Sequence, residues 1–403
     1  MEILKLVFNV LEIALYVYLA FAAVYIFIFA FAGIFGYKQK KSKTTKLRKY
    51  AVLIPGYKED SVIIDVAKDA LNQNYPSEKF DVVIIADSFK QETLDELKKL
   101  KIKLVEVSFE VSTKSKALNK AMQTIGDDYD VAVILDADNL MEKEFLNKVN
   151  NAFDNGFEVV QGHRVAKNVN TSFAILDAIS EEVNNHIFRK GHRVLGLSSA
   201  LIGSGMAFDY AFFKNTMAEV KAVGGFDKEL ELKLLRNKTK IEYINEALVY
   251  DEKVQKSEVF ANQRRRWLSA QFVYFRRFFF AGLFHLFFKG NIDFFDKVYQ
   301  MVQPPRVLLL GGTAIITIFY GIIKIINIEI LNSWFYYNVC EWLLVFTIVF
   351  VAFIFSIPRK FWNKNTLIAV LTLPKAFFIM GLSLLKLRGA NKKFIHTTHG
   401  TED

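Results

Sequence analysis

Residues 131–138 read Val-Ala-Val-Ile-Leu-Asp-Ala-Asp. A short apolar run that ends in a turn is typical of a strand buried in a sheet. Asp136 and Asp138 end this run, and two carboxylates one residue apart can coordinate a hard divalent cation. Aspartate is also common in ordinary turns, so the pair alone does not define a site. The sequence on either side decides between the two interpretations.

Strand-like runs and amphipathic helical stretches alternate through the first half of the chain. The runs that match strands are Ala51–Ile54, Val82–Ala86, Lys103–Val107 and Val131–Leu135, and the helical stretches are Val62–Asn72, Glu92–Leu100 and Lys116–Gln123. This alternation predicts βαβ units and therefore an α/β fold with a mostly parallel sheet. In such sheets, ligands bind at the carboxyl ends of the strands. The first strand is followed there by Pro55, Tyr57 and Glu59, and the second by Asp87.

Phosphate-binding motifs narrow the class of enzyme. The sequence contains neither G-x-G-x-x-G nor G-x-x-x-x-G-K-[ST], which disfavours a dinucleotide-dependent enzyme and a P-loop ATPase. Lys114 and Lys116 precede a helical stretch and are candidates for contacts to phosphate. Later in the chain, Gly203-Ser204-Gly205 predicts a tight turn of small residues.

Three apolar runs are long enough to cross a bilayer, which needs about 20 residues. They are Ile13–Tyr37, Val307–Ile328 and Trp334–Ile357. A cleavable signal peptide is the alternative for the first run, but the run is too long and its start is not basic. The basic segment 38–49 follows that run, which predicts a cytoplasmic side there and an external N-terminus. We expect an integral protein of the plasma (inner) membrane with a cytoplasmic catalytic domain.

Two further segments are expected at the membrane surface. In the apolar stretch Leu367–Leu387, Pro374 and Lys375 interrupt the middle, and a basic tail follows. This pattern favours an interfacial or re-entrant helix with a cytoplasmic tail. Ser257–Phe288 reads as one long helix in which phenylalanines mix with arginines. That composition predicts a helix in the membrane interface, with an ordinary buried helix as the alternative.

Charge and cysteine content constrain the partners. The net charge is +10 and the sequence pI is about 9.3, which suits an anionic membrane surface or a phosphorylated substrate. The basic residues flank the apolar runs, so a nucleic-acid partner is not expected. Cys340 is the single cysteine, so no intramolecular disulfide can form.

The ordered set of motifs resembles the membrane-bound family 2 glycosyltransferases of the processive polysaccharide synthase type. These include the cellulose, chitin, hyaluronan and poly-N-acetylglucosamine synthases. The resemblance covers about residues 50–267 and rests on the segment 54–59, on Asp87, on Asp136-Ala137-Asp138, on Gly203-Ser204-Gly205 and on Gln263-Arg264-Arg265-Arg266-Trp267. The last of these, a Q-x-x-R-W motif, is the most specific piece.

The resemblance implies a GT-A-like domain inserted between transmembrane helices. The expected organisation is a transmembrane helix in 1–37, a cytoplasmic GT-A domain in 48–256, amphipathic interface helices with the Q-x-x-R-W motif in 257–304, a transmembrane hairpin in 305–357, and an interfacial helix with a cytoplasmic tail in 358–403.

The resemblance also implies roles for single residues. Asp87 and Asp138 would bind the uridine and the metal-bound diphosphate of a UDP-sugar, with Asp136 beside them and Mg²⁺ or Mn²⁺ as the metal. Gln263, Arg264 and Arg266 would line the diphosphate or acceptor site, and Trp267 would stack on the acceptor sugar. The remaining substrate-binding candidates are Pro55, Tyr57, Glu59, Lys116, Gly203, Ser204 and Gly205.

The catalytic base is where the sequence departs from the family. The family has an acidic pair, whereas this chain has Lys228-Glu229, preceded by Asp227. An inverting transfer needs one carboxylate near the acceptor hydroxyl as general base. We expect Glu229 in that role, with Asp227 as the second candidate. In the tail, Phe394, Thr397 and His399 match a gating loop that contacts the substrate in related synthases. A frayed terminus is the alternative interpretation of the tail.

The implied function is inverting, metal-dependent transfer from a UDP-sugar of glucose or N-acetylglucosamine type. The acceptor would be a growing polysaccharide, lengthened at its non-reducing end and passed through the membrane. One alternative is a non-processive enzyme that makes a glycolipid, and a second is an inactive membrane binding protein. Expected partners are the UDP-sugar, a polysaccharide or lipid acceptor and membrane lipids. Accessory subunits or a homo-oligomer are open.

Overall fold

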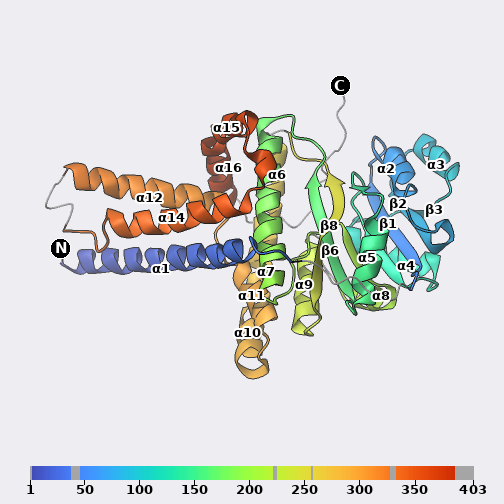
Figure 1. Cartoon of the computed structure of the whole chain (residues 1–403), viewed down its shortest axis with the longest axis horizontal. Coiled ribbons are helices and arrows are strands. Elements are labelled where there is room, and N and C mark those ends of the chain that lie inside the picture. The colour runs from blue at the N-terminus through green and yellow to red at the C-terminus, as the bar shows by residue number, and fades with distance from the viewer. Residues whose placement is uncertain (1, 38–45, 221–224, 256, 327–332, 386–403) are drawn as a thin grey trace.

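The computed structural model describes residues 2–37, 46–220, 225–255, 257–326 and 333–385. Three long apolar helices lie side by side at one end of the molecule, and a sheet covered by helices lies at the other (Figure 1). A middle layer of helices runs across the direction of the apolar helices and separates them from the sheet (Figure 1).

The sheet of the described residues has eight strands in the order β3-β2-β1-β4-β7-β6-β8-β5. The strands are β1 (Tyr50–Tyr57), β2 (Phe80–Asp87), β3 (Lys103–Val107), β4 (Val131–Ile134), β5 (Leu140–Met141), β6 (Val159–Ala166), β7 (Met206–Asp209) and β8 (Ile241–Asp251). The four strands predicted from the apolar runs are confirmed as β1 to β4, and they form a parallel half of the sheet.

The other half of the sheet is mixed. Strand β7 is antiparallel to both β4 and β6, β8 is parallel to β6, and β5 is antiparallel to β8. The expectation of a mostly parallel sheet therefore holds for β1 to β4 and not for the whole. The register aligns Tyr57 with Asp87, so the ends of β1 and β2 lie at the same edge.

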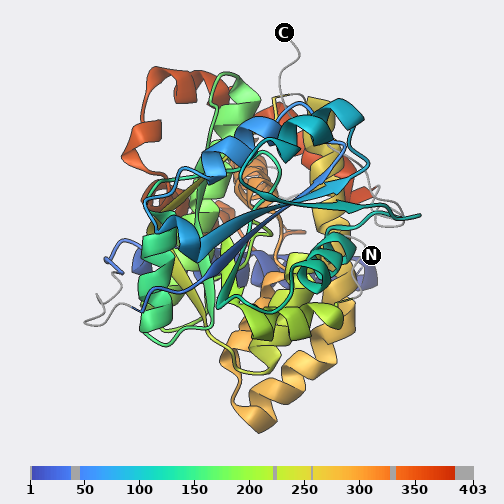
Figure 2. The same ribbon diagram turned by 90° about the vertical axis from the view of Figure 1, so that its right-hand side faces the viewer.

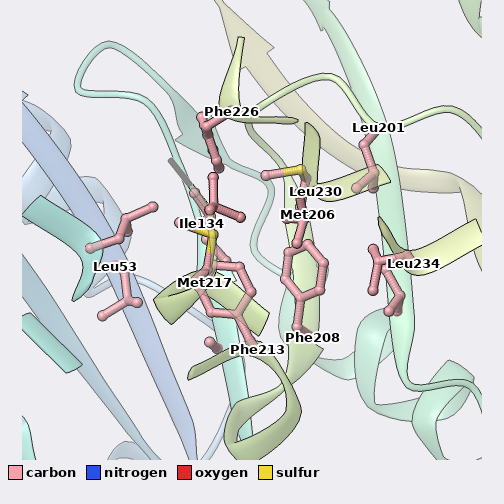
Figure 3. Packing of buried hydrophobic residues seen from close by; sticks show 14 of the residues in the cluster. Leu53, Ile134, Leu201, Met206, Phe208, Phe213, Met217, Phe226, Leu230 and Leu234 are labelled. Atoms are coloured by element: carbon pink, nitrogen blue, oxygen red, sulfur yellow. The ribbon is translucent and has the colours of Figure 1, made fainter. Parts of the chain in front are cut away.

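Two apolar cores lie on the two faces of the sheet. Along β1, Leu53 packs with one core, and Val52 and Ile54 pack with the other, as the two-residue period of a strand requires. The first core packs against α4 (Lys114–Ile125), α8 (Tyr210–Ala218) and α9 (Phe226–Arg236), and Figure 3 shows its centre around Ile134, Met206 and Phe208. The second packs against α2 (Ile63–Ala70), α3 (Gln91–Lys98) and α5 (Phe145–Asp154).

The three apolar helices are α1 (Glu2–Ala32), α12 (Arg306–Ile326) and α14 (Val339–Ser356), and each is long and apolar enough to cross a membrane. At a rise of about 1.5 Å per residue, even the 18 residues of α14 extend about 27 Å. The carboxylate of Glu12, which is buried in α1, accepts hydrogen bonds from the Tyr320 hydroxyl at 2.5 Å and from the backbone N–H of Tyr336 at 2.8 Å. This carboxylate joins the first apolar helix to α12 and to the segment that leads into α14.

The last apolar stretch is broken, as the position of Pro374 predicted. It forms α15 (Lys364–Val370) and α16 (Leu373–Leu385), and the two helices are bent by 46° relative to each other. Pro374 lies in the first turn of α16, where the missing backbone N–H is not needed by the helix. The bend is compatible with either a broken span or a re-entrant segment.

The middle layer contains α6 (Ser172–Asn184), the π-helix η2 (Asn185–Gly191), α10 (Ser257–Lys289) and α11 (Ile292–Gln300). Figure 2 shows the sheet from the side opposite the apolar helices, with α10 and α11 extending beyond it. One face of α10, with Tyr274 and Phe278, is buried on the first core, whereas Phe280 and Phe287 are more than 70% exposed. This helix is therefore buried on one face only.

Candidate functional site

One large cavity, of approximately 1760 Å³, lies at the carboxyl ends of the parallel strands. Pro55, Tyr57 and Glu59 line it from the end of β1, and Asp87 lines it from the end of β2. Asp136 and Asp138 follow β4 and line the same cavity. The structure thus brings together all the strand-end residues that the sequence singled out. The volume exceeds the roughly 300–1,000 Å³ of a typical single-ligand pocket, so there is room for two substrates.

Asp138 is 2% exposed and is held by the segment after β8. One of its oxygens accepts the backbone N–H of Glu252 at 3.1 Å, and the other accepts the side-chain amide of Asn139 at 3.2 Å. Asp87 is similarly buried and accepts a hydrogen bond from the Ser88 hydroxyl at 3.0 Å. Both carboxylates are fixed in direction, which suits the repeated binding of one ligand geometry.

Asp136 lies beside Lys114, one of the two lysines that the sequence predicted as candidates for contacts to phosphate. The ammonium group of Lys114 donates to the Asp136 carboxylate at 2.5 Å and to the Gly203 carbonyl at 2.8 Å. Lys116 is exposed, lies outside the cavity lining and donates to the carbonyl of Val111 at 2.9 Å. Helix α4 begins at Lys114, so residue 116 is rotated by about 200° from it and points away.

A buried network of charges lines the cavity beside Asp136. Arg164 of β6 contacts Glu181 of α6 at 2.8 Å, Asp251 at 3.6 Å and Asp136 at 3.8 Å. Lys253 pairs with both Glu181 and Asp251. Burial opposes ionisation of the Glu181 carboxyl, but Arg164 and Lys253 more than offset burial and hold its pKa below the ordinary value. The four charges are compensated inside the protein and form a rigid support.

The turn Gly203-Ser204-Gly205 lies behind the cavity and does not line it. Gly203 and Gly205 both have positive φ angles, which explains the glycines. The side-chain amide of Gln161 donates to the Ser204 carbonyl at 3.0 Å, and the Lys114 ammonium holds the Gly203 carbonyl. This turn supports the residues that line the cavity. Its own three residues are not part of the lining.

The two candidates for a catalytic base lie in different places. Asp227, in the first turn of α9, lines the cavity and packs against Gly203, where an added Cβ would lie 3.8 Å from its carboxyl carbon. Glu229 is 1% exposed, lies outside the cavity lining and faces Arg277 at 3.6 Å. Burial and then the charge of Glu229 raise the pKa of the nearby Tyr274 hydroxyl. The orientation of α9 therefore favours Asp227 over our first choice, Glu229.

The Q-x-x-R-W segment lies in the first half of α10, and Gln263, Arg264, Arg266 and Trp267 all line the cavity. Arg264 is fixed by an ion pair with Asp177 of α6 and lies between two aromatic rings, 4.7 Å from the Phe260 centroid and 4.5 Å from that of Trp267. Burial lowers the pKa of the Arg266 guanidinium, which still remains charged at neutral pH. The indole of Trp267 is 39% exposed and is open to the cavity.

The same cavity continues to the base of the apolar helices. Its lining there includes Arg306, the first residue of α12, together with Phe188 and Arg189 of the π-helix and Met380 of α16. The Arg306 guanidinium lies over the Phe188 ring at 5.1 Å. The cavity therefore extends from the edge of the sheet to the base of the helices that are apolar enough to cross a membrane.

The donors present fit a divalent cation only if a substrate completes the coordination. Among the described residues, no group of three His, Cys, Asp or Glu side chains is arranged to hold a metal ion. Mg²⁺ in phosphate-binding sites is commonly held by one or two carboxylates and by substrate phosphates. Asp136 and Asp138 supply such a pair.

Some expectations lie outside the described residues, and some site residues were missed. Phe394, Thr397 and His399 fall in the segment 386–403, which the structure does not describe. Asp251, which ends β8, carries the same strand-end signal as Asp87 but is not among the residues predicted from the sequence. Arg164, Glu181 and Lys253 carry no signal in the sequence, because three separate segments bring them together.

Comparisons with known proteins identify the fold. Residues 48–270 match the family described as Glycosyltransferase like family 2. Comparison with curated proteins by sequence gives no match.

Similar solved structures include the mannosyltransferase PcManGT from Pyrobaculum calidifontis in complex with GDP-Man and Mn²⁺. It has 14% identity and a TM-score of 0.49, over 86% of this chain and 99% of that one. Another is S. aureus TarS 1–349 in complex with UDP-GlcNAc, with 18% identity, a TM-score of 0.38 and 52% of this chain. This chain covers 60% of the length of that TarS fragment.

The family match covers more than half of the chain and includes the strand-end aspartates and the α10 motif. The mixed α/β sheet is accordingly of the GT-A type, with apolar helices before and after it. The chain belongs to glycosyltransferase family 2.

Proposed function

We propose that this enzyme transfers a sugar from a UDP-sugar to an acceptor with inversion at the anomeric carbon. The observation that supports this most is the composition of the one cavity. Strand-end carboxylates line it together with Asp227 and with the α10 residues Gln263, Arg266 and Trp267. A transferase needs this arrangement, because donor and acceptor must meet in a fixed geometry.

The donor site is proposed at the edge of the sheet. Asp87 is placed to bind the uridine, and Asp136 and Asp138 to hold Mg²⁺ or Mn²⁺ together with the diphosphate. When bound, the cation supplies positive charge to the leaving diphosphate. The network of Arg164, Glu181, Asp251 and Lys253 fixes the Asp136 carboxylate through Arg164. The fixed carboxylate would then orient the diphosphate.

Asp227 is proposed as the general base, with Glu229 as the second candidate. The Asp227 carboxylate accepts the proton of the acceptor hydroxyl as that oxygen forms its bond to the anomeric carbon. The bond between this carbon and the diphosphate oxygen breaks at the same time, and UDP leaves with the electron pair. Trp267 offers an indole face on which the acceptor sugar can stack, and Arg266 offers a guanidinium for phosphate.

Two classes of acceptor remain, a growing polysaccharide and a lipid-borne acceptor. A processive synthase was expected from the resemblance and stays a prediction. The extension of the cavity to Arg306 of α12 and Met380 of α16 favours a lipid-borne acceptor, because both residues belong to helices at the membrane. A single transfer to a lipid also needs no wide channel through the three or four candidate spans.

The catalytic domain is proposed to face the cytoplasm. The sheet lies at the end of α1 that is followed by the basic segment 38–49, and α12 begins and α14 ends on this same side (Figure 1). Arg359 and Lys360 follow α14 directly. An excess of Lys and Arg on one side marks the cytoplasmic face.

The experiment that tests this function is nucleotide release from a panel of UDP-sugars with Mg²⁺ or Mn²⁺, followed by sizing of the product. Release of UDP that depends on metal and on Asp138 supports the proposal. A ladder of long chains would identify a polysaccharide synthase, and a single glycolipid would identify a single-transfer enzyme. If no UDP-sugar is turned over or bound with either metal, the alternative of an inactive binding protein gains the support.

A further inference from the structure

The membrane end of the cavity holds more positive charge than the protein neutralises. Arg189, Arg264 and Arg306 all line it, and the charges of Arg264 and Arg189 act on Arg306. Within the described part of the chain, the one carboxylate that pairs with these three guanidinium groups is Asp177, which pairs with Arg264. Arg189 donates to an amide and a carbonyl oxygen instead, those of Asn185 at 2.7 Å and Ala200 at 3.2 Å.

An unused hydrogen-bond donor lies at the same end. The Nε atom of Arg264 is buried and has no hydrogen-bond partner among the described residues. The side chain of Arg264 lines the cavity. A buried donor without an acceptor costs about 1–3 kcal/mol, so an acceptor from a ligand would stabilise this end of the cavity.

Arg306 could instead serve only to reach lipid headgroups, as arginines at the ends of spans often do. Its side chain, however, is partly buried, lines the cavity and stacks on Phe188 of the π-helix. It is also the first residue of α12, where a helix N-terminus disfavours a cation. Both features argue that the guanidinium is kept there for an anion that enters the cavity.

We propose that this end of the cavity binds the phosphate group of a lipid-borne acceptor, with Arg306 as the main contact. Arg306 lies where the chain enters the membrane, which is the level of lipid headgroups. Val307 of α12 and Met380 of α16 add apolar lining beside it, which suits the first carbons of an acyl or alkyl chain. This inference rests on the proposed transferase function and specifies its acceptor as a lipid that carries a phosphate group in addition to the hydroxyl that receives the sugar.

The test is equilibrium binding of radiolabelled dodecyl phosphate to the full-length protein in phosphatidylcholine nanodiscs. Unlabelled dodecanol, inorganic phosphate and UDP serve as competitors. We expect dodecanol and inorganic phosphate to compete at least about 10-fold more weakly than dodecyl phosphate, because each lacks one half of the ligand. Equal competition by inorganic phosphate would reveal a site for free anions, and equal competition by dodecanol would reveal lipid partitioning. Either result overturns the proposal.

Variants separate the membrane end from the donor site. Arg306→Gln should weaken dodecyl phosphate binding at least about 10-fold and leave UDP binding unchanged, whereas Arg306→Lys should restore most of it. The matched control is Arg359→Gln, which removes an exposed arginine on the same side of the membrane and should change neither. Loss of UDP binding with dodecyl phosphate retained would assign Arg306 to the donor site and overturn the inference.

The outcomes also separate this inference from the proposed function. If UDP binds and dodecyl phosphate shows no preference over dodecanol, the lipid phosphate is wrong and the transferase stands. If UDP and the UDP-sugars do not bind at all, the transferase itself is wrong. Should Arg306→Gln not fold, the comparison of dodecyl phosphate with dodecanol on the unchanged protein decides alone.

Discussion

The two ends of the cavity differ in how their charges are balanced. At the sheet edge, three cations (Arg164, Lys253 and Lys114) pair with three carboxylates (Glu181, Asp251 and Asp136). At the membrane end, the described residues place three arginines against the carboxylate of Asp177. These ion pairs at the sheet edge are therefore formed within the protein itself, which preorganises the proposed donor site. The proposed lipid phosphate would supply the missing negative charge at the membrane end.

The largest expected effect comes from the sheet edge. Asp138→Asn keeps the shape of the side chain but removes a charge that would hold the metal-bound diphosphate. We expect UDP release to fall about 1000-fold, because charge stabilisation of a leaving group is worth several kcal/mol. The measurement is steady-state UDP release with Mn²⁺. Asp128→Asn, a change at an exposed aspartate far from the cavity lining, is the control and should retain full activity. Normal turnover in Asp138→Asn would contradict the proposed donor site.

The next largest effect should separate Asp227 from Glu229, the two candidates on α9 for the general base. Asp227→Asn should lower the rate of transfer by about 10²- to 10⁴-fold, as expected for loss of a general base, with donor binding unchanged. Glu229→Gln should stay within about 10-fold of the unchanged enzyme, because Glu229 lies outside the cavity lining. Transfer rates and UDP binding are measured for both. The opposite ranking would return the base to Glu229.

The sheet edge and the membrane end of the cavity should also differ in how much the loss of one cation lowers the free energy of unfolding. Lys253→Met leaves Glu181 and Asp251 less well compensated in a buried site, and we expect a loss of about 3–5 kcal/mol in the free energy of unfolding. Arg306→Met removes a cation without a carboxylate partner among the described residues, so we expect a change within about 1 kcal/mol or a slight stabilisation. Thermal unfolding in detergent compares the two. Equal losses would mean that Arg306 is already neutralised inside the protein.

Acid should weaken the sheet edge first. The folded-state pKa of Glu181 lies below its ordinary value because the attraction of Arg164 and Lys253 exceeds the cost of burial. The ion pairs thus stabilise the fold above the unfolded pKa of about 4.3, and this stabilisation is lost as the pH falls through the lower folded pKa. We expect unfolding temperatures to drop below about pH 4.3, and the drop should be smaller in Glu181→Gln. An equal drop in that variant would show that other carboxylates are responsible.

The sequence predicted what depends on local pattern. The apolar runs predicted β1 to β4 and the three apolar helices, and the strand ends predicted the positions of Asp87, Asp136 and Asp138. The sequence could not predict which side of a helix faces the cavity, or which residues far apart in the chain form ion pairs. The choice of Lys114 over Lys116, and of Asp227 over Glu229, depends on where α4 and α9 begin and how they are rotated. The ion pair of Arg264 with Asp177 joins residues 87 positions apart.

One measurement tests most directly whether the two ends have different tasks. It is a cryo-electron microscopy map of the full-length protein with UDP and Mn²⁺ in a phosphatidylcholine nanodisc. We predict that the uracil lies by Asp87 and the diphosphate by Asp136 and Asp138, with no nucleotide density at Arg306. A diphosphate bound by Arg189 and Arg306 would contradict the account, because the membrane end would then be the donor site.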